Sequence, residues 1–411
     1  MIADELTVRL GDVVVATLVR FDDDRILLAF DRAYIDDSDR PTLGLAFNDE
    51  HDGIVTDQRP TRRRAPAYFA NLLPEGHLRR YIAARAEVNE TRDFPLLRLL
   101  GGDLPGAVVL VGEREPAGDP TRTEDQLTAE APLRFSLAGV QLKFSALAEA
   151  AGGLTVPAHG QGGDWIVKLP SVAYLGVPEN EFAIMSLARA VGIDTPDVEL
   201  VPVRAIQGLP TDALPDELAG ANALAVRRFD RTATGRVHTE DFAQVFNQYP
   251  ERKYERVSYA NIGAVLAAFS DHHAVDQFSR RLAFSALVGN ADMHLKNWSL
   301  IYRDGRTPEL APAYDLLSTT AYLADDRMAL TLGRTKRWDQ LAVEDFRRLA
   351  GAMAVPATAM VEPALETVER FRTTWTEHAR QLGISEAVAA AVERQAKTVP
   401  LVAQARDRPA S

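Results

Sequence analysis

The sequence contains no cysteine among its 411 residues, so disulfide bonds and thiolate metal sites are excluded. It also has no apolar run that approaches the roughly 18 residues needed for a membrane helix. The N-terminal stretch MIADELTVRLGD lacks the basic and apolar regions of a secretion signal. These absences predict a cytoplasmic protein without a membrane segment.

Positive charge is also scarce, because 46 lysine and arginine residues face 58 aspartate and glutamate residues, for a formal net charge of −12. This balance argues against broad, unassisted binding to nucleic acid. Two stretches are nevertheless basic, DQRPTRRR (Asp57–Arg64) and HLRRYIAAR (His77–Arg85). They are either solvated surface or a basic patch that contacts DNA or an acidic partner.

The rest of the composition is that of an ordinary globular protein, with 46% hydrophobic and 25% charged residues. A chain of this length is expected to form two or three packed subdomains. Strand-like alternation over residues 1–55 gives way to helical periodicity from Pro66. Residues 114–132 are rich in Pro, Gly, Thr and acidic residues, and we expect them to be a linker.

Beyond this linker, two strand-like segments lead to IVKLP. Residues 178–193 predict a helix, with Asn180 as its N-cap and Gly192 at its end. Further strands follow, and from Thr239 the chain reads as mainly helical. We therefore predict an α+β fold with three parts: a sheet-and-helix module at 1–115, a sheet-rich lobe at 130–238 and a helical lobe at 239–411.

The stretch VGNADMHLKNWSLIY (Val288–Tyr302) places several polar side chains directly before a strand-like segment. Asp292 and Asn297 lie five residues apart there, and a hairpin could return Asp315 beside Asn297. Mg²⁺ prefers oxygen ligands and is often held by one or two protein groups plus substrate phosphates. Protein kinases combine a catalytic Asp, an Asn five residues later and a metal-binding Asp after a hairpin.

Simpler interpretations of this stretch remain open. Asp and Asn in a turn before a strand often bond only local backbone groups. His294 beside Asp292 could indicate a metallohydrolase, but one histidine without a second in register is a weak zinc signal.

A kinase interpretation makes further demands upstream. Lys168 lies in the apolar segment DWIVKLP, a costly position for a charge unless an anion meets it. An acid on the following helix should orient this lysine, and Glu181 is favoured over Glu179 for that role. The loop FSLAGVQLK has one glycine and does not match the G-x-G-x-x-G pattern, so it must grip phosphate by other means.

Taken together, these motifs resemble the HipA-type toxin kinases of bacterial type II toxin–antitoxin systems. The resemblance spans roughly residues 65 to 320 and rests on several motifs in the family's order. These are NLLPEG, SLAGVQLK, IVKLP, ENEFAIMSLARAVGI, AVRRFDR, EDFAQ, GNADMHLKN and PAYDLLS.

The resemblance implies a bilobal fold like that of protein kinases, with ATP and Mg²⁺ as cofactors. Asp292 would be the catalytic base, Asn297 and Asp315 the metal ligands, and Lys168 the phosphate-binding lysine oriented by Glu181. Ser136 would be the serine that family members autophosphorylate, which ejects the loop and silences the enzyme. The nucleotide would also contact three further parts of the chain. These are a phosphate loop of Ala138, Gly139, Val140, Gln141, Leu142 and Lys143, a hinge of Arg227, Arg228 and Phe229, and the catalytic-loop residues His294, Leu295, Lys296 and Asn297. The family's hinge often has an acidic residue where this chain has Arg227. A backbone contact to adenine would survive that change, but a side-chain contact would not.

The resemblance also implies a serine/threonine protein kinase that acts as a toxin. Its partners would be a helix-turn-helix antitoxin of the HipB type and, mainly through it, operator DNA. The acidic balance is consistent with needing that antitoxin for DNA affinity. The substrate would be a translation-related protein such as an aminoacyl-tRNA synthetase. A small-molecule kinase and a catalytically idle scaffold are the alternatives, and the intact Lys168, Asp292, Asn297 and Asp315 argue against the scaffold.

Overall fold

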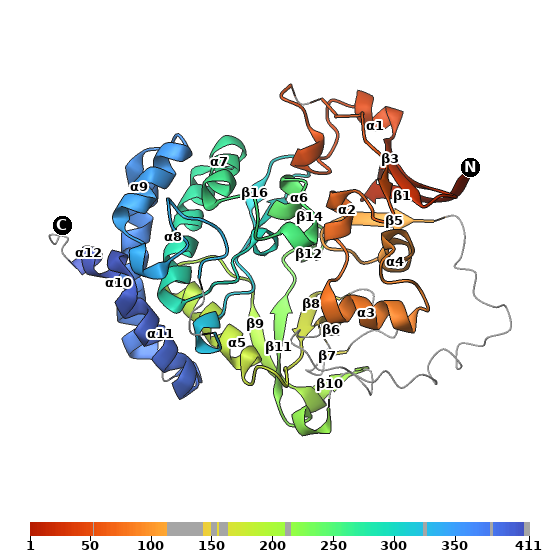
Figure 1. The fold of residues 1–411 in the computed structure, drawn as a ribbon. Helices are drawn as coiled ribbons and strands as arrows, with labels where there is room; N and C mark the ends of the chain where they lie inside the picture. The colour runs from red at the N-terminus through yellow and green to blue at the C-terminus, as the bar shows by residue number, and fades with distance from the viewer. Residues whose placement is uncertain are drawn as a thin grey trace.

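The structure is a computed structural model that describes residues 1–51, 53–112, 143–148, 154–155, 163–209, 215–323, 327–378 and 381–406 (Figure 1). Buried apolar side chains form three clusters: one in the N-terminal part, one beneath a six-stranded sheet and one among the C-terminal helices. Figure 1 shows the N-terminal strands and the last helices at opposite ends, with β8 and β11 between them.

The N-terminal unit, residues 1–112, is built on an antiparallel five-stranded sheet with the order β4-β3-β2-β1-β5. Alternation along the first strand places Leu6, Val8 and Leu10 in the core, as a period of two requires. The strand expectation for residues 1–55 is thus confirmed in β1, β2 and β3. The elements are β1 (Ile2–Leu10), β2 (Val13–Phe21), β3 (Arg25–Phe30), α1 (Arg32–Asp36), β4 (Thr61–Arg62), α2 (Ala67–Asn71), α3 (Gly76–Arg85), α4 (Asp93–Leu100) and β5 (Val108–Val111).

A six-stranded sheet with the order β10-β7-β6-β8-β11-β9 follows. Its central strand β8 is antiparallel to both neighbours, and Lys168 at its end pairs with Leu224 of β11. Along β8, the buried residues Trp165 and Val167 alternate with the half-buried Ile166. Trp165 and Val167 anchor the strand to the core beneath the sheet. The strands are β6 (Lys143–Ala148), β7 (Leu154–Thr155), β8 (Trp165–Lys168), β9 (Val198–Pro202), β10 (Ile206–Gln207) and β11 (Asn222–Arg227).

Helix α5 (Val177–Ala190) covers this sheet and contacts β9 and β11. Its predicted end is confirmed, because Gly192 follows the helix with a φ of 92°, a left-handed conformation that glycine adopts readily. The prediction of Asn180 as N-cap is wrong. Gly176 caps the helix, and Asn180 lies inside it as a buried residue whose amide bonds elsewhere.

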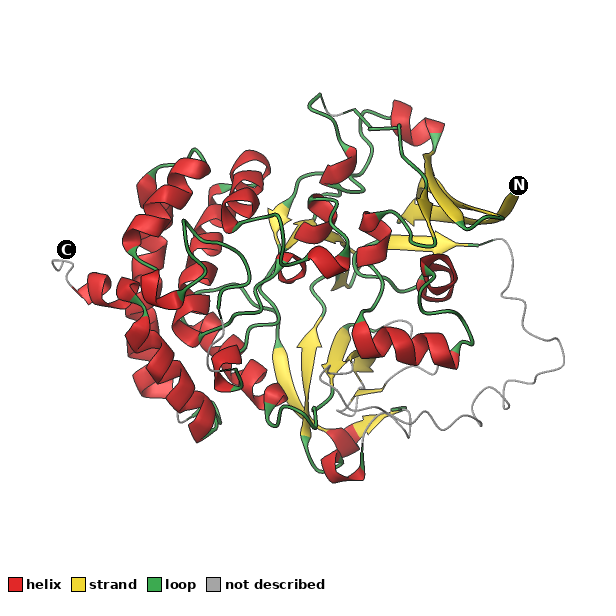
Figure 2. Cartoon of the chain, viewed as in Figure 1, coloured by secondary structure: helices red, strands yellow, loops and turns green. Residues whose placement is uncertain are grey.

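The C-terminal part is helical, as Figure 2 shows, but it begins with a strand. The helical expectation fails at Thr239, because β14 (His238–Asp241) pairs with β15 (Ser299–Tyr302), which in turn pairs with β16 (Glu309–Leu310). The long helix α8 ends at Gly289, whose φ of 67° turns the chain into the polar loop. The helices are α6 (Phe242–Val245), α7 (Tyr259–Phe269), α8 (His272–Val288), α9 (Val343–Ala352), α10 (Ala357–His378), α11 (Glu386–Thr398) and α12 (Pro400–Arg406).

None of the helices within the described ranges combines the length and the apolar character that a membrane crossing requires.

Candidate functional site

The loop between α8 and β15 is closed by its own side chains. The amide nitrogen of Asn297 donates to the backbone carbonyl of Asp292 at 2.7 Å, and the backbone N–H of His294 donates to the same carbonyl at 2.8 Å. Because the nitrogen of Asn297 is committed to the loop, its side-chain oxygen is the atom left to offer to a cation. The Asp292 side chain is 46% exposed and reaches the surface.

The β15–β16 hairpin brings Asp315 to this loop through the residue before it. The hydroxyl of Tyr314 donates to the carbonyl of Lys296 at 2.8 Å and lies 2.6 Å from the Ser299 hydroxyl. Asp315 itself has a φ of 53°, a left-handed conformation that few non-glycine residues adopt. Unusual backbone of this kind occurs preferentially at functional sites, where surrounding contacts hold it in place.

Lys168 and Glu181 form a buried ion pair, and the partly buried Asp315 joins it. The ammonium of Lys168 contacts one carboxylate oxygen of each acid, and the side chains of Lys168 and Glu181 are only 5% and 3% exposed. Burial alone would lower the pKa of Lys168, but the two carboxylates outweigh it and raise that pKa above its ordinary value. The lysine is therefore a fixed positive charge at the end of β8.

Asn180 connects α5 to the segment that follows Asp315. Its amide nitrogen donates to the carbonyl of Ser318, and its amide oxygen accepts from the backbone N–H of Ser318, both at 3.0 Å. Asn180 and Ser318 are both buried. The helix that provides Glu181 thus also fixes the position of the Asp315 segment.

His294 is buried beside Asp292. Burial, together with the nearby Lys253 ammonium, lowers the pKa of His294 to about 3, so the imidazole is neutral. Its Nδ1 atom is buried and has no hydrogen-bond partner among the residues that the structure describes. A buried acceptor or donor of this kind is costly unless a ligand or water meets it. Leu295, by contrast, is fully buried in the apolar core.

Lys296 is engaged by the N-terminal unit. Its ammonium lies 2.9 Å from Glu75 and donates to the carbonyl of Asn71 at 3.0 Å. Glu75 also accepts from Lys253 at 3.2 Å. Burial would raise the pKa of Glu75, but Lys296 and Lys253 lower it to about 2. Sequence reasoning noted NLLPEG as a motif without assigning Glu75 a role, because its partners lie far along the chain.

The predicted hinge is held mostly by internal bonds. The backbone N–H groups of Arg227 and Arg228 donate at 2.8 Å to the carbonyls of Asp197 and Asp164, so neither is left for an adenine base. The exposed side chain of Arg227 lies at the end of β11. Phe229 packs against Tyr314, with ring centroids 5.8 Å apart.

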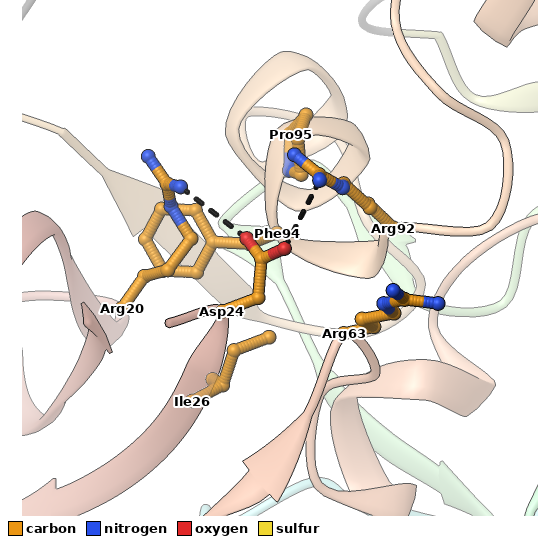
Figure 3. A pocket seen from close by; sticks show the side chains of 7 residues that line it. All are labelled: Arg20, Asp24, Ile26, Arg63, Arg92, Phe94 and Pro95. Atoms are coloured by element: carbon orange, nitrogen blue, oxygen red, sulfur yellow. Dashed lines mark ion pairs between the residues drawn. The ribbon is translucent and has the colours of Figure 1, made fainter. Parts of the chain in front are cut away.

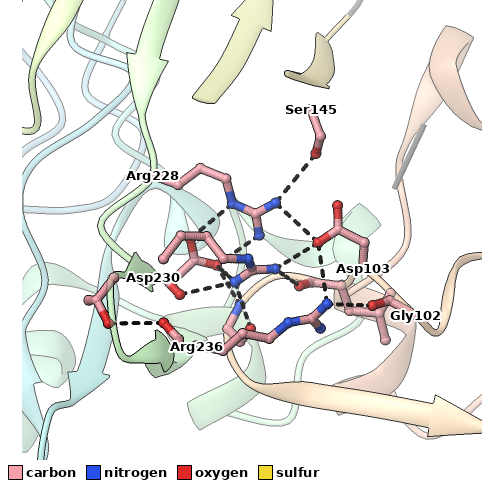
Figure 4. A network of polar contacts seen from close by, with 11 residues as sticks. Gly102, Asp103, Ser145, Arg228, Asp230 and Arg236 are labelled. Carbon is pink, nitrogen blue, oxygen red and sulfur yellow. Dashed lines mark hydrogen bonds and ion pairs between the residues drawn. The ribbon is translucent and has the colours of Figure 1, made fainter. Parts of the chain in front are cut away.

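Arg228 belongs to an ion network with the N-terminal unit, shown in Figure 4. Its guanidinium pairs with Asp230 at 2.9 Å and with Asp103 at 3.3 Å, and the Asp103 carboxylate also pairs with Arg231 at 2.8 Å. The side chains of Arg228 and Asp103 are 5% and 3% exposed. The hinge is therefore tied to the end of the N-terminal unit by buried charges.

The predicted phosphate loop, Ala138 to Leu142, and the predicted phosphoserine, Ser136, lie outside the described residues. Lys143, the last residue of that loop, begins β6 and pairs with Lys168 in the register of the sheet. The backbone at the end of the loop therefore adjoins the strand that provides the buried lysine.

A separate hollow in the N-terminal unit is lined by arginines, as Figure 3 shows. Arg92 and Arg20 pair there with Asp24 at 3.1 and 3.6 Å. Arginines of the two basic stretches also have internal partners, since Arg64 pairs with Glu251 and Arg79 with Asp93. Part of the basic character seen in the sequence is thus neutralised by carboxylates within the fold.

Comparison with known proteins gives matches along most of the chain. Residues 6–111 match the family description "HipA N-terminal domain", and residues 135–375 match "HipA-like C-terminal domain". The chain is 49% identical over 401 residues to the candidate kinase Y4dM of Sinorhizobium fredii, a match that covers 96% of this chain and 97% of that protein. It is 27% identical over 313 residues to the serine/threonine-protein kinase toxin HipA of Shewanella oneidensis, with 66% of each chain covered.

Among solved structures, the chain is similar to one from the complex of HipA, HipB and operator DNA of the Shewanella oneidensis MR-1 toxin–antitoxin system. The TM-score is 0.72 at 22% identity, with 98% of this chain and 100% of the matched chain covered. This likeness confirms the predicted α+β, kinase-like fold.

Proposed function

Since this chain belongs to the HipA family of kinases, we propose that it is an ATP- and Mg²⁺-dependent serine/threonine protein kinase that acts as the toxin of a toxin–antitoxin pair. The observation that carries the proposal is the buried cluster of Lys168, Glu181 and Asp315. It lies beside a loop in which Asp292 and Asn297 are already bonded to each other. A buried lysine held by two acids is expensive as structure alone and is well suited to binding phosphate.

In this proposal Lys168 binds the nucleotide phosphates and Glu181 keeps its ammonium in place. The phosphates would meet the Lys168 ammonium beside Asp315, whose carboxylate contacts the same ammonium. His294 remains neutral and lies at the edge of the nucleotide site, where its buried Nδ1 would meet a ligand or water. We expect Phe229, whose ring packs against Tyr314, to contact the adenine.

Asn297 and Asp315 fit a magnesium ion by the chemistry of their donor atoms, since both offer oxygen. Within the described residues, no three acidic or histidine side chains cluster closely enough to hold a metal by themselves. The remaining oxygens would come from the nucleotide phosphates and water. Mg²⁺ bound in this way would neutralise developing charge on the transferred phosphoryl group.

Asp292 orients the acceptor hydroxyl and receives its proton. A positioned base of this kind typically contributes about 10²–10⁴-fold to a rate. The 46% exposure of the Asp292 side chain favours an acceptor on a protein surface over a small molecule in a closed pocket. The family resemblance adds an aminoacyl-tRNA synthetase as the expected class of substrate, and Ser136 as a site of autophosphorylation.

The partner proposal rests on a relative. The Shewanella structure contains HipA together with HipB and operator DNA. By analogy, we expect this chain to bind a helix-turn-helix antitoxin and to reach operator DNA mainly through it. The net charge of −12 is consistent with basic phosphate contacts being supplied by the antitoxin.

Incubation of the purified chain with γ-labelled ATP and Mg²⁺ tests the proposal. We expect label on protein, and we expect Asp292→Asn to reduce total phosphoryl transfer by roughly 10²-fold or more while the melting temperature stays unchanged. Near wild-type transfer by a folded Asp292→Asn variant would remove Asp292 from the mechanism. An absence of transfer by the wild-type chain, with nucleotide still bound, would favour the scaffold alternative.

A further inference from the structure

The carboxylate of Asp292 has a partner that the sequence motifs do not include. The hydroxyl of Tyr254 donates a hydrogen bond to Oδ1 of Asp292 at 2.6 Å. Tyr254 lies between the short helical turn Pro250–Arg252 and α7. It precedes Asp292 by 38 residues. A hydrogen bond from a neutral donor to a carboxylate is among the stronger kinds in proteins.

Tyr254 is held against the catalytic loop by more than this bond. Its ring meets the His294 ring edge to face, with centroids 5.0 Å apart and an interplanar angle of 83°. The residue before it, Lys253, accepts from the backbone N–H of Leu295 at 3.2 Å and pairs through its ammonium with Glu75. The tyrosine and the loop therefore behave as one packed unit.

The pair also faces outward. Tyr254 is 42% exposed, and the Asp292 side chain is 46% exposed. Lys168 and Glu181, by contrast, are almost fully buried. Tyr254 and Asp292 are therefore both accessible to an acceptor on another protein.

We propose that Tyr254 is a positioning residue for the phosphoryl acceptor. The inference rests on the proposed role of Asp292 as base. A carboxylate has two oxygens that accept hydrogen bonds, and Tyr254 fixes the carboxylate by occupying one of them. This bond fixes the orientation in which the carboxylate meets the acceptor hydroxyl, and the exposed Tyr254 side chain forms one wall of the acceptor site.

A different role is conceivable for the same contact, in which the tyrosine hydroxyl blocks the base and leaves when the acceptor binds. The packing on His294 argues against departure, since a swing of the Tyr254 side chain would break it. The backbone bond from Leu295 to Lys253 holds the preceding residue against the loop. The two roles predict opposite effects of removing the hydroxyl. A positioning residue loses activity, whereas a blocking residue gains it.

The test is Tyr254→Phe in the full chain, which removes the hydroxyl and keeps the ring on His294. Transfer of the γ-phosphoryl group from ATP to protein and to water is measured over a range of ATP concentrations. We expect kcat to fall roughly 10- to 100-fold, because a hydrogen bond to a charged group is lost, while KM for ATP stays within about 2-fold of wild type. A purely structural role would move melting temperature and KM together with kcat.

Tyr249→Phe is the matched control, because the Tyr249 hydroxyl donates to the carbonyl of Ala65 at 3.2 Å and makes no bond with Asp292. Its kcat should equal that of wild type. Asp292→Asn separates the inference from the proposed function, and adding Tyr254→Phe to it should cause no further loss. If Asp292→Asn is inactive while Tyr254→Phe matches or exceeds wild type, the positioning role is wrong and the base assignment stands. If Asp292→Asn keeps its activity, the base assignment and the inference both fail.

Discussion

Lys168 and Glu181 pair with each other across the sheet–helix boundary, and both side chains are almost completely removed from water. The alternative acid, Glu179, instead accepts from the amide of Asn222 at 3.1 Å. The two glutamates are two residues apart and so point to different sides of the helix, Glu181 toward the buried lysine and Glu179 toward a strand end. The preference for Glu181 drawn from the sequence agrees with this geometry.

The first prediction compares these two acids. Glu181→Gln should lower kcat/KM for ATP roughly 10- to 100-fold, because Lys168 loses a charged partner and moves toward Asp315. Glu179→Gln is the matched control on the same helix and should remain within about 2-fold of wild type. Steady-state ATP turnover measures both variants. Equal losses in the two would mean that the helix tolerates neither change and that no special role belongs to Glu181.

The second prediction concerns the cation. Asn297→Ala and Asp315→Ala should each weaken nucleotide binding in the presence of Mg²⁺ by roughly 10-fold or more and have a smaller effect with EDTA. The reason is that each variant removes an oxygen ligand. Calorimetric titration with ATP under the two conditions provides the comparison. Unchanged Mg²⁺-dependent affinity in Asp315→Ala would show that the cation binds elsewhere.

The third prediction concerns Ser136. Prolonged incubation with ATP and Mg²⁺ should add one phosphate there, and the modified chain should bind ATP more weakly. The phosphate adds about −1.5 to −2 charges, which compete with ATP for cationic groups such as Lys168. Mass spectrometry locates the phosphate, and Ser136→Ala should block the modification while nucleotide binding persists. A phosphate found at another residue, or undiminished ATP binding after modification of Ser136, would refute this self-inhibition.

The fourth prediction is a pH dependence of stability centred on Glu240. This side chain is fully buried, and burial raises its pKa from 4.5 to about 7 despite hydrogen bonds from Tyr302 and from the backbone N–H of Leu45, while nearby Asp241 raises it further. Folding therefore favours the protonated acid. Its stabilising contribution is complete below pH 4.5 and is lost as the pH rises through about 7, with a total of about 3 kcal/mol.

Glu240→Gln removes the titration and keeps an oxygen for the same two donors. The melting temperature of this variant, relative to wild type, should thus be higher at about pH 8 than at about pH 5. Thermal unfolding of both proteins at the two pH values makes the measurement. A relative melting temperature that does not change with pH would mean that Glu240 is ionised at no net cost.

Local spacing was enough to predict the core of the candidate site. Asp292 and Asn297 lie in one loop, and Asp315 follows one hairpin later, so their proximity depends on few long-range contacts. Lys168 could be predicted because a lysine at the end of an apolar strand is unusual in any sequence.

The residues that sequence reasoning missed depend on distant contacts. Tyr254 meets Asp292 from 38 residues away, and Glu75 meets Lys253 from 178 residues away. Asn180 was predicted as a cap from its neighbours alone, whereas its side chain is used by Ser318, 138 residues later. Thr239 reads as helical locally but lies in β14, whose partner strand is β15. Tertiary pairing decided each of these cases.

The buried network around Asp103 has a consequence for expressing the C-terminal part of the protein by itself. A fragment that starts near the beginning of the second family region would retain Arg228, Arg231 and Asp230 but lose Asp103, which both arginines also contact. Removing one partner of a buried ion pair commonly costs about 3–5 kcal/mol, which is much of the stability of a typical domain. The shorter product should therefore be recovered in poor yield. The second region depends on the N-terminal unit for its stability.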